Sequence, residues 1–450
     1  MTKKTLPVSP WFWLLLTALL AAGIAMRLAH FQDVRSRGPD ERVYSYFAGR
    51  IAHDGFSAVP SLFAGYEANV ASRIYPGPTR FGHLPVYAAA MKFMGDPTPR
   101  AGATVSLVCS VLSLLLCAWM GLRFFTPPAA LFAVAFLASS VGELGMARRA
   151  WQDAFFGFLS FVLVYVTCEI ARRPRDLRLY AWFYSTGVFC LITKENAVVP
   201  YGICGLCLFA ILALRERSWK AALPFALGGL ASIGVALGIF CLLAGSPRLA
   251  LSVLDHALWH QTADPTNWTA RCCSGPWYQF SYLLWMVGPI VTAAALLGAA
   301  VFLLRQRISN ETERPGLGAA LPCLLITFGV WAFASFYGDI QNLRMFSPAD
   351  GTLCLLAGIG MAGLLSIAHP ALGPTAYRAM AALVLATVAA GALHDYGVFR
   401  SVVVATDMQE LPAVAIIHLM EPTAIAAGRL PAAARPVPGP DAKPEPERTR

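Results

Sequence analysis

Two adjacent acids, Asp40 and Glu41, are the residues whose chemistry is easiest to state from the sequence. They stand in the segment GPDERVY at residues 38–44, directly after the first apolar run. Acids in the first turn of a helix complement its macrodipole, and spacing alone favours that structural interpretation. A carboxylate held at a helix start near a membrane interface is also desolvated enough to act as a general base. The residues by themselves leave both interpretations open.

Basic residues that could face such an acid occur in other short connectors between apolar runs. Arginine suits bidentate contact with phosphate, whereas the simpler interpretation is snorkelling at the membrane interface. The simplest account of Asp153 is a salt bridge to Arg149, four residues earlier, and that of Lys194 is an ion pair with its neighbour Glu195. The cations are Arg148, Arg149, Lys194 and Arg344.

The polar segment 246–281 contains histidines, aromatic residues and two cysteines. His256 and His260 are one helical turn apart and could share a metal, but no further ligand pattern accompanies them and we expect surface histidines. Cys272 and Cys273 lie in a polar loop, whereas the other cysteines lie in apolar runs, so no disulfide framework is predicted. The aromatic residues predict an interfacial belt or a sugar-stacking rim: Trp259, Trp268, Trp277 and Tyr278.

The elements that must position these residues are membrane-spanning helices. Of the 450 residues, 57% are hydrophobic and 13% are charged, whereas soluble domains carry about a quarter charged residues. The mean hydropathy is +0.57. The net charge of +10 is spread over short connectors and forms no basic domain, which argues against nucleic-acid binding.

The sequence predicts an all-α integral membrane protein with about eleven transmembrane helices, each needing roughly 20 apolar residues. We expect the first helix to be retained rather than cleaved as a signal peptide. The runs at 128–142 and 179–193 are short, which indicates tilted helices or different boundaries. The expected spans are 11–29, 101–122, 128–142, 152–170, 179–193, 197–214, 221–245, 282–304, 316–337, 349–367 and 379–394.

The basic connectors predict the orientation of these helices. With a cytoplasmic N-terminus, every strongly basic short connector faces inward, as the positive-inside rule requires. The long connectors 30–100 and 246–281 then face outward, as does the tail. The inward residues are Arg123, Arg172, Arg173, Arg175, Arg178, Arg215, Arg217, Lys220, Arg305, Arg307 and Arg314.

The chain divides into three expected parts. Residues 1–215 form a membrane module that includes the outer loop 30–100, and residues 216–394 form the C-terminal spans with the outer loop 246–281. Residues 395–450 form an outer tail, too poor in apolar residues to fold from about 430 onward. Within the first loop, Val43, Phe47 and Ile51 recur at four-residue spacing, which predicts amphipathic helix at the membrane interface.

Several short motifs, in order, resemble those of one family. They are Asp40-Glu41-x-x-Tyr44, His83 in HLPVY at 83–87, Arg100 at a span start, ARRAWQD at 147–153, TKE at 193–195 and NLRMFSP at 342–348. The set resembles membrane glycosyltransferases of the protein O-mannosyltransferase type, which include bacterial lipid A aminoarabinose transferases. Leu84 replaces a proline of the family's His-Pro-Pro-Leu-Tyr stretch.

This resemblance implies a C-type glycosyltransferase fold and an inverting transfer of a hexosyl or pentosyl group. The donor would be a polyprenyl-phosphate-linked sugar, and the acceptor a glycan, lipid or protein on the non-cytoplasmic face of a bacterial inner membrane. Asp40 would be the base, and Glu41 is the second choice as a catalytic residue, either as the base or to position the acceptor or a metal. No cofactor is implied with certainty, and a divalent metal stays open. The residues expected to bind substrate are Tyr44, His83, Arg148, Arg149, Asp153, Lys194, Glu195 and Arg344.

Two other classes of function are weighed against this one. A transporter or lipid flippase often carries repeated halves, but the sequence shows no repeat. A membrane scaffold without activity would keep the fold and lack a working base.

Overall fold

The computed structural model describes residues 9–69, 76–262, 288–308, 317–336, 343–405 and 407. Throughout these ranges the regular elements are helices. In chain order they are α1 (Pro10–Ala29), α2 (Pro39–Asp54), η1 (Gly55–Ala58), α3 (Val59–Ala68), α4 (Leu84–Met94), α5 (Pro99–Phe124), α6 (Pro127–Ser139), α7 (Val141–Ala147), α8 (Asp153–Arg172), α9 (Leu177–Leu191), η3 (Glu195–Ala197), α10 (Val198–Arg215), α11 (Trp219–Ala244), α12 (Pro247–Thr262), α15 (Pro289–Ile308), α16 (Leu317–Phe336), η5 (Leu343–Phe346), α17 (Ser347–Ala371), α18 (Pro374–Val398) and η6 (Phe399–Val404).

The prediction of an all-α membrane protein is confirmed, because every expected apolar run contains helix. In the described ranges, seven helices are long and apolar enough to cross a membrane, or eight if α6 and α7 count as one bent span. Helices α9, α15 and α16 are shorter or have shorter apolar stretches. The expected number of eleven therefore stays a prediction. The run at 128–142 is longer than expected and is broken, since α6 and α7 meet at 53°.

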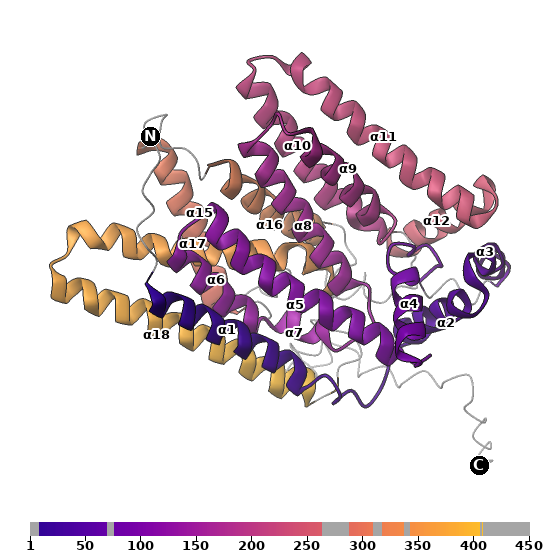
Figure 1. Cartoon of the computed structure of the whole chain (residues 1–450), viewed down its shortest axis with the longest axis horizontal. Helices are drawn as coiled ribbons and strands as arrows, with labels where there is room; N and C mark the ends of the chain where they lie inside the picture. The colour runs from indigo at the N-terminus through magenta and orange to yellow at the C-terminus, as the bar shows by residue number, and fades with distance from the viewer. Residues whose placement is uncertain are drawn as a thin grey trace, which may run out of the picture.

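The main apolar core lies around α17 and α8. Helix α17 packs against α15, α6, α16 and α8 (Figure 1), and 72% of its most apolar window is buried. Helices α1 and α18 lie at the edge, with only 17% of their windows buried. The edge helices therefore present mostly apolar surface outward, as a lipid-facing helix does.

A second apolar cluster joins the first outer loop to the bundle. Helices α2 and α4 pack on each other at one end of the molecule, and α3 packs on α12 (Figure 1). Phe47 and Ile51 of α2 are buried as expected, together with Tyr44, and the Phe63 ring stacks on Phe81 with centroids 5.6 Å apart. The amphipathic helix predicted in this loop is therefore confirmed, and its apolar face packs on protein.

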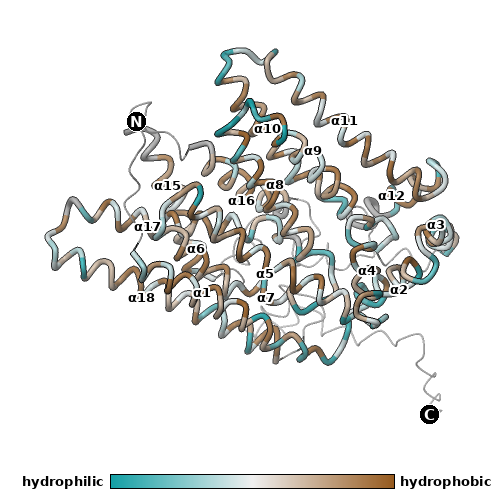
Figure 2. Tube along the Cα trace, in the orientation of Figure 1, coloured by the Kyte–Doolittle hydropathy of each residue, from teal (hydrophilic) through white to brown (hydrophobic). Residues whose placement is uncertain are grey.

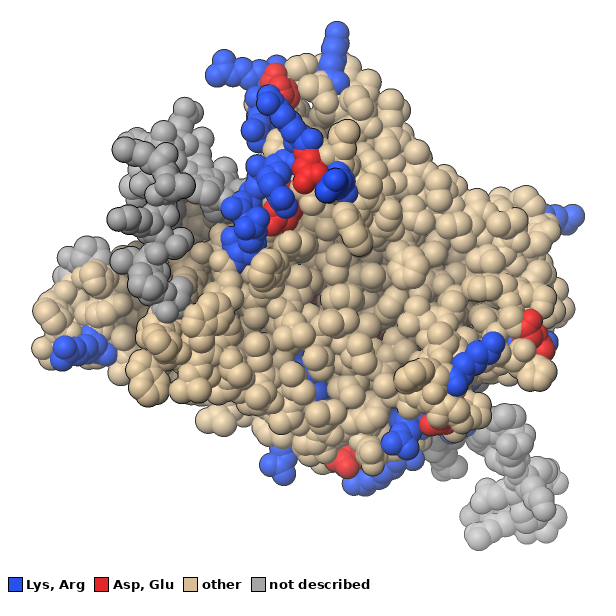
Figure 3. All heavy atoms as spheres, viewed as in Figure 1, with Lys and Arg blue, Asp and Glu red and all other residues tan. Residues whose placement is uncertain are grey.

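Charge and hydropathy divide the surface. The helices are brown along most of their length in Figure 2, with teal at the turns between them. In Figure 3, most charged side chains lie near the ends of the bundle, and uncharged surface covers the space between. At the end predicted to face inward, Glu169 accepts hydrogen bonds from Arg123 and Arg173, both at 2.8 Å. This pattern fits a multi-pass membrane protein.

Candidate functional site

Asp40 lies at the start of α2 and faces the turn that precedes α17. Its Oδ2 accepts a hydrogen bond from Arg344 Nη1 at 3.0 Å, and the Asp40 side chain is 22% exposed. The Arg344 guanidinium in turn lies over the Trp151 ring, 4.5 Å from its centroid. Residues far apart in sequence thus hold one partly accessible carboxylate beside a fixed cation.

Glu41 lies next to Asp40 but is 0% exposed. Its carboxylate accepts hydrogen bonds from the backbone N–H groups of Gly38 and Ala150, both at 2.8 Å. It also accepts from Arg37 at 2.9 Å and Arg149 at 3.1 Å. Glu41 therefore joins the start of α2 to the turn before α8, and Asp40 is the acid of the pair that is left accessible.

The expected salt bridge between Arg149 and Asp153 is wrong. Helix α7 ends at Ala147 and α8 begins at Asp153, so the two residues do not share a helix and four-residue spacing does not bring them together. Arg149 instead donates to Glu41, to Asp407 Oδ1 at 3.4 Å and to the Ser36 carbonyl at 2.6 Å.

Asp407 was not foreseen as part of this region. Its Oδ2 accepts from the backbone N–H groups of Arg35 at 2.9 Å and Ser36 at 2.7 Å. The nearest carboxylate oxygen to Arg148 is Asp407 Oδ1, at 3.7 Å. Within the described part of the chain the three Arg148 nitrogens have no hydrogen-bond partner, and burial lowers the pKa of Arg148 to about 10.

The expected pair of Lys194 with Glu195 is also wrong. The Lys194 backbone is extended, with φ −155° and ψ 140°, and extended backbone sends neighbouring side chains to opposite sides. Lys194 Nζ bonds to Asp153 at 2.5 Å, and burial lowers the Lys194 pKa although Asp153 opposes the shift. Glu195 pairs instead with Arg80 at 2.9 Å and accepts from Thr79 at 2.8 Å.

Arg80 is a site residue that the motifs did not reveal. It is only 4% exposed, and its Nε and Nη1 have no hydrogen-bond partner among the described residues. Burial acts to lower the Arg80 pKa, but Glu195, Tyr44, Asp153 and Asp40 together outweigh it, and the pKa lies above its ordinary value. The signal available in the sequence was a basic residue three positions before His83 in a polar turn.

The turn at Gly82 brings two of the motifs together. The Gly82 N–H donates to the Ile192 carbonyl at 2.8 Å, and a Cβ at this position would collide with the Thr193 hydroxyl. Glycine is therefore required for the His83 segment to lie against the segment that carries Lys194.

His83 is enclosed by aromatic rings. Its ring centroid lies 6.2 Å from Tyr44, 5.7 Å from Tyr87 and 5.8 Å from Phe155. Both ring nitrogens lack hydrogen-bond partners in the described structure. Burial lowers the His83 pKa to about 4, so the ring is neutral at physiological pH.

The predicted residues separate into two neighbouring groups. One group surrounds Tyr44. Burial raises the Tyr44 pKa, and the charges of Arg80, Asp40, Asp153 and Arg344 are close enough to affect it. Lys194 and His83 belong to the same group through Asp153. Glu41, Arg148 and Arg149 form the second group, beside Asp407. Arg100 lies exposed at the start of α5.

Several buried polar atoms of the first group have no hydrogen-bond partner among the described residues. Leaving such atoms unpaired is costly, so a concentration of them is typical of a binding site. The donors suit an anion such as a phosphate. The atoms are Arg80 Nε and Nη1, Trp151 Nε1 and Asp153 Oδ2. Gln152 Oε1 and Ser347 Oγ, whose residues are close to Asp153 and Arg344 in sequence, also lack partners.

Other predicted features lie apart from this site. His256 pairs with Glu67 at 3.1 Å, whereas the side chains of His260 and Trp259, and residues Trp268, Cys272, Cys273, Trp277 and Tyr278, lie outside the described structure. Within the described ranges, no three His, Cys, Asp or Glu side chains are grouped to hold a metal.

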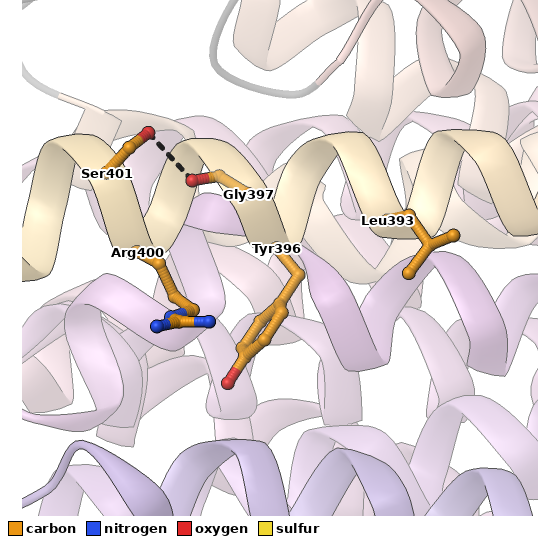
Figure 4. Close-up of a pocket in the computed structure, with 5 residues that line it drawn as sticks. All are labelled: Leu393, Tyr396, Gly397, Arg400 and Ser401. Atoms are coloured by element: carbon orange, nitrogen blue, oxygen red, sulfur yellow. Dashed lines mark hydrogen bonds between the residues drawn. The ribbon is translucent and has the colours of Figure 1, made fainter.

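Two hollows also lie apart from Asp40. One of about 290 Å³ lies between α2 and α3 and is lined by Tyr46, Arg50 and Tyr66 among others. The other is an open groove along α18 and η6, where Tyr396 and Arg400 point to the same side of the helix (Figure 4). Neither lining includes Asp40 or the residues around it.

No protein-family model and no curated protein sequence matches the chain. Its fold is similar to that of ArnT from Cupriavidus metallidurans bound to undecaprenyl phosphate, with a TM-score of 0.56 and 16% identity over 87% of this chain and 76% of that one. It is also similar to the archaeal oligosaccharyltransferase AglB from Archaeoglobus fulgidus, solved with an inhibitory peptide and a dolichol-phosphate. There the TM-score is 0.59 and the identity 12%, over 87% of this chain and 56% of that one. The fold implied by the motifs is therefore confirmed.

Proposed function

We propose that this chain, which shares the membrane fold of ArnT and AglB, is an inverting glycosyltransferase. It moves a sugar from a polyprenyl-phosphate-linked donor to an acceptor. The structures of similar fold were solved with undecaprenyl phosphate and with a dolichol-phosphate. Both are polyprenyl phosphates, and this shared ligand class supports the assignment of the donor.

The single observation that carries the proposal is the setting of Asp40. It is a partly exposed carboxylate, held by Arg344 at 3.0 Å, beside buried donors that lack partners in the described structure. Glycoside hydrolysis uses two carboxylates, one of them as the acid for the leaving group. A phosphate leaves without such an acid, so transfer needs one base and positive charge near the departing group.

The reaction follows from these roles. Asp40 accepts the proton of the acceptor hydroxyl while that oxygen forms a bond to the anomeric carbon. The bond from the anomeric carbon to the phosphate oxygen breaks, and its electron pair leaves with the phosphate. Arg80, Arg344 and the Trp151 N–H are the donors that would hold that phosphate. One displacement inverts the configuration at the anomeric carbon.

The orientation belongs to the same proposal. The basic connectors support a position of Asp40 on the non-cytoplasmic side, at the level where we expect lipid phosphate groups. We assign the protein to the inner membrane of a bacterium, with the acceptor, a glycan, lipid or protein, approaching from outside.

The test compares glycolipids and glycoproteins by mass spectrometry in cells that lack the protein. Restoring the wild-type chain should restore one sugar modification, and Asp40→Asn should not, although it is produced at the same level. Asp54→Asn is the matched control, because Asp54 ends the same helix and is exposed. If Asp40→Asn restores the modification fully, the proposed base is wrong.

The alternative of a transporter or lipid flippase makes a different prediction. A flippase would change the side of the membrane on which a lipid-linked sugar is found and would transfer nothing in detergent. The absence of a sequence repeat and the grouping of Asp40, Asp153, Lys194 and Arg344 in one region favour the enzyme.

A further inference from the structure

A break in one membrane span lies directly before the site. Helices α6 and α7 are bent by 53°, and Ser140 between them has the non-helical angles φ −52° and ψ 123°. In an unbroken helix the carbonyls of Leu137 and Ala138 would accept from residues 141 and 142. A break removes those bonds, and unpaired carbonyls are costly inside a membrane protein.

Arg27 of α1 supplies the missing donors. Its Nη2 donates to the Leu137 carbonyl at 3.1 Å, and its Nη1 donates to the Ala138 carbonyl at 3.2 Å. The side chain is 0% exposed. Arg27 reaches the break because α1 approaches α6 closely: a Cβ on Gly23 would lie 2.9 Å from the Ala138 Cβ.

A second charge lies on the other side of the break. Arg27 Nε donates to Ser110 Oγ at 2.8 Å, and the Ser110 hydroxyl donates to Glu143 Oε2 at 2.6 Å. The direct distance from Arg27 Nη2 to Glu143 Oε2 is 3.9 Å. Glu143 is in the first turn of α7. The positive Arg27 side chain thus contacts the C-terminal end of α6, and the negative Glu143 side chain lies in the N-terminal turn of α7. Each charge is opposite in sign to the helix-dipole end beside it.

The direction of α7 decides where the next residues lie. Immediately after it, Arg149 and the Ala150 N–H bond to Glu41. The Trp151 ring supports Arg344, the partner of Asp40. Ionisable side chains buried within spans are costly and are retained where they serve a purpose.

We propose that Arg27, Ser110 and Glu143 form a buried clasp that fixes the bend between α6 and α7 and so positions Arg149 and Trp151 beside Asp40. These three are positioning residues, and none of them touches the reacting atoms. The structural part of the proposal stands on the hydrogen bonds, whereas its effect on transfer rests on the proposed function.

Hydrogen exchange of the full-length protein in detergent tests the structural part. Arg27→Gln removes the charge and Arg27→Lys keeps it. We expect backbone amides of residues 141–152 to exchange at least about tenfold faster in Arg27→Gln, with Arg27→Lys between it and wild type. Amides of α10 and α11 should not change. Arg123→Gln is the matched control. It also removes an arginine that pairs with a glutamate, but Arg123 lies in the last turn of α5 and bonds to Glu169, away from the break between α6 and α7.

The outcomes separate the clasp from the proposed function. Unchanged exchange at 141–152 in a folded Arg27→Gln protein would overturn the clasp, whatever the activity. If Arg27→Gln does not fold, Ser110→Ala keeps both charges and removes the bridge, and wild-type exchange in that variant would overturn it equally. The transfer rate should fall about tenfold in Arg27→Gln and be partly restored by Arg27→Lys. Faster exchange in a protein whose wild type transfers no sugar would contradict the proposed function and leave the clasp standing.

Discussion

At the scale of single residues, Asp40 and Glu41 are neighbours whose carboxylates have different surroundings. Glu41 is enclosed by two N–H groups and two arginines, whereas Asp40 has one arginine partner and an accessible side chain. The helix-start interpretation of the acidic pair therefore holds for Glu41, whereas the role of Asp40 as a base stays a prediction.

His83 gives a prediction about pH at the same scale. Its folded-state pKa is about 4, because burial disfavours the charged ring, and an unfolded histidine has a pKa of about 6.5. As pH falls from 6.5 to 4, the unfolded chain takes up a proton that the folded chain does not. The His83 contribution to stability is therefore present above pH 6.5 and is lost through this window, by at most about 1.4 kcal/mol per pH unit.

The measurement is the thermal unfolding temperature of His83→Phe and wild type in detergent from pH 4 to 7.5. Phe keeps an aromatic ring among Tyr44, Tyr87 and Phe155. The decrease in unfolding temperature at acidic pH should therefore be smaller in His83→Phe than in wild type. His53→Phe is the control, because the His53 side chain is 86% exposed. Parallel curves for His83→Phe and wild type would show that His83 is not held neutral.

At the scale of elements, the segment after α18 belongs to the site region. It continues through η6 to Val404, and Asp407 then binds the N–H groups of Arg35 and Ser36. Asp407 also pairs with Arg149 at 3.4 Å. The segment after α18 therefore anchors residues 35 and 36, which precede Asp40 in the chain.

We predict that Asp407→Asn weakens this anchor. It removes the charge opposite Arg148 and Arg149, and the loss should be about 1–3 kcal/mol of unfolding free energy. Transfer should fall as well, because the loop before Asp40 loses its support. Thermal unfolding and activity are measured beside Asp255→Asn, which changes an exposed acid on α12. If the two variants have the same unfolding temperature and the same activity, Asp407 does not stabilise the segment before Asp40.

At the scale of the whole molecule, the apolar runs predicted the bundle well, because the length and apolar character of a span are local properties of the sequence. The motifs also predicted a shared region for Asp40, Tyr44 and Arg344. The pairings were predicted poorly. The sequence could not show that α7 ends at Ala147 and that Arg149 and Asp153 do not share a helix.

The residues that were missed share one physical reason. Arg80, Asp407 and Arg27 pair with groups more than 80 positions away in sequence. No local spacing indicates such a partner. A single charged residue in a connector, such as Arg80, is usually solvated, and one near the end of a span, such as Arg27, usually extends to the interface. Only the packing of the helices identifies these three residues as buried and paired.

The orientation of the bundle gives a further prediction. Lys92 on α4 and Lys220 on α11 are both exposed, and the basic connectors predict that they lie on opposite sides of the membrane. In a background with Cys272 and Cys273 replaced by Ser, Lys92→Cys should react with a membrane-impermeant maleimide in spheroplasts. Lys220→Cys should react only after the membrane is permeabilised. The reverse pattern would put Asp40 on the cytoplasmic side.

The most direct test of the account separates donor binding from chemistry in Asp40→Asn. The purified variant is loaded with its polyprenyl-phosphate-linked sugar, and the rate of a single turnover is compared with the donor dissociation constant. A general base contributes about 10² to 10⁴ in rate. We predict a loss of that size with donor affinity within about twofold of wild type. An unchanged rate, or a loss explained entirely by weaker donor binding, would contradict the role of Asp40 as the base.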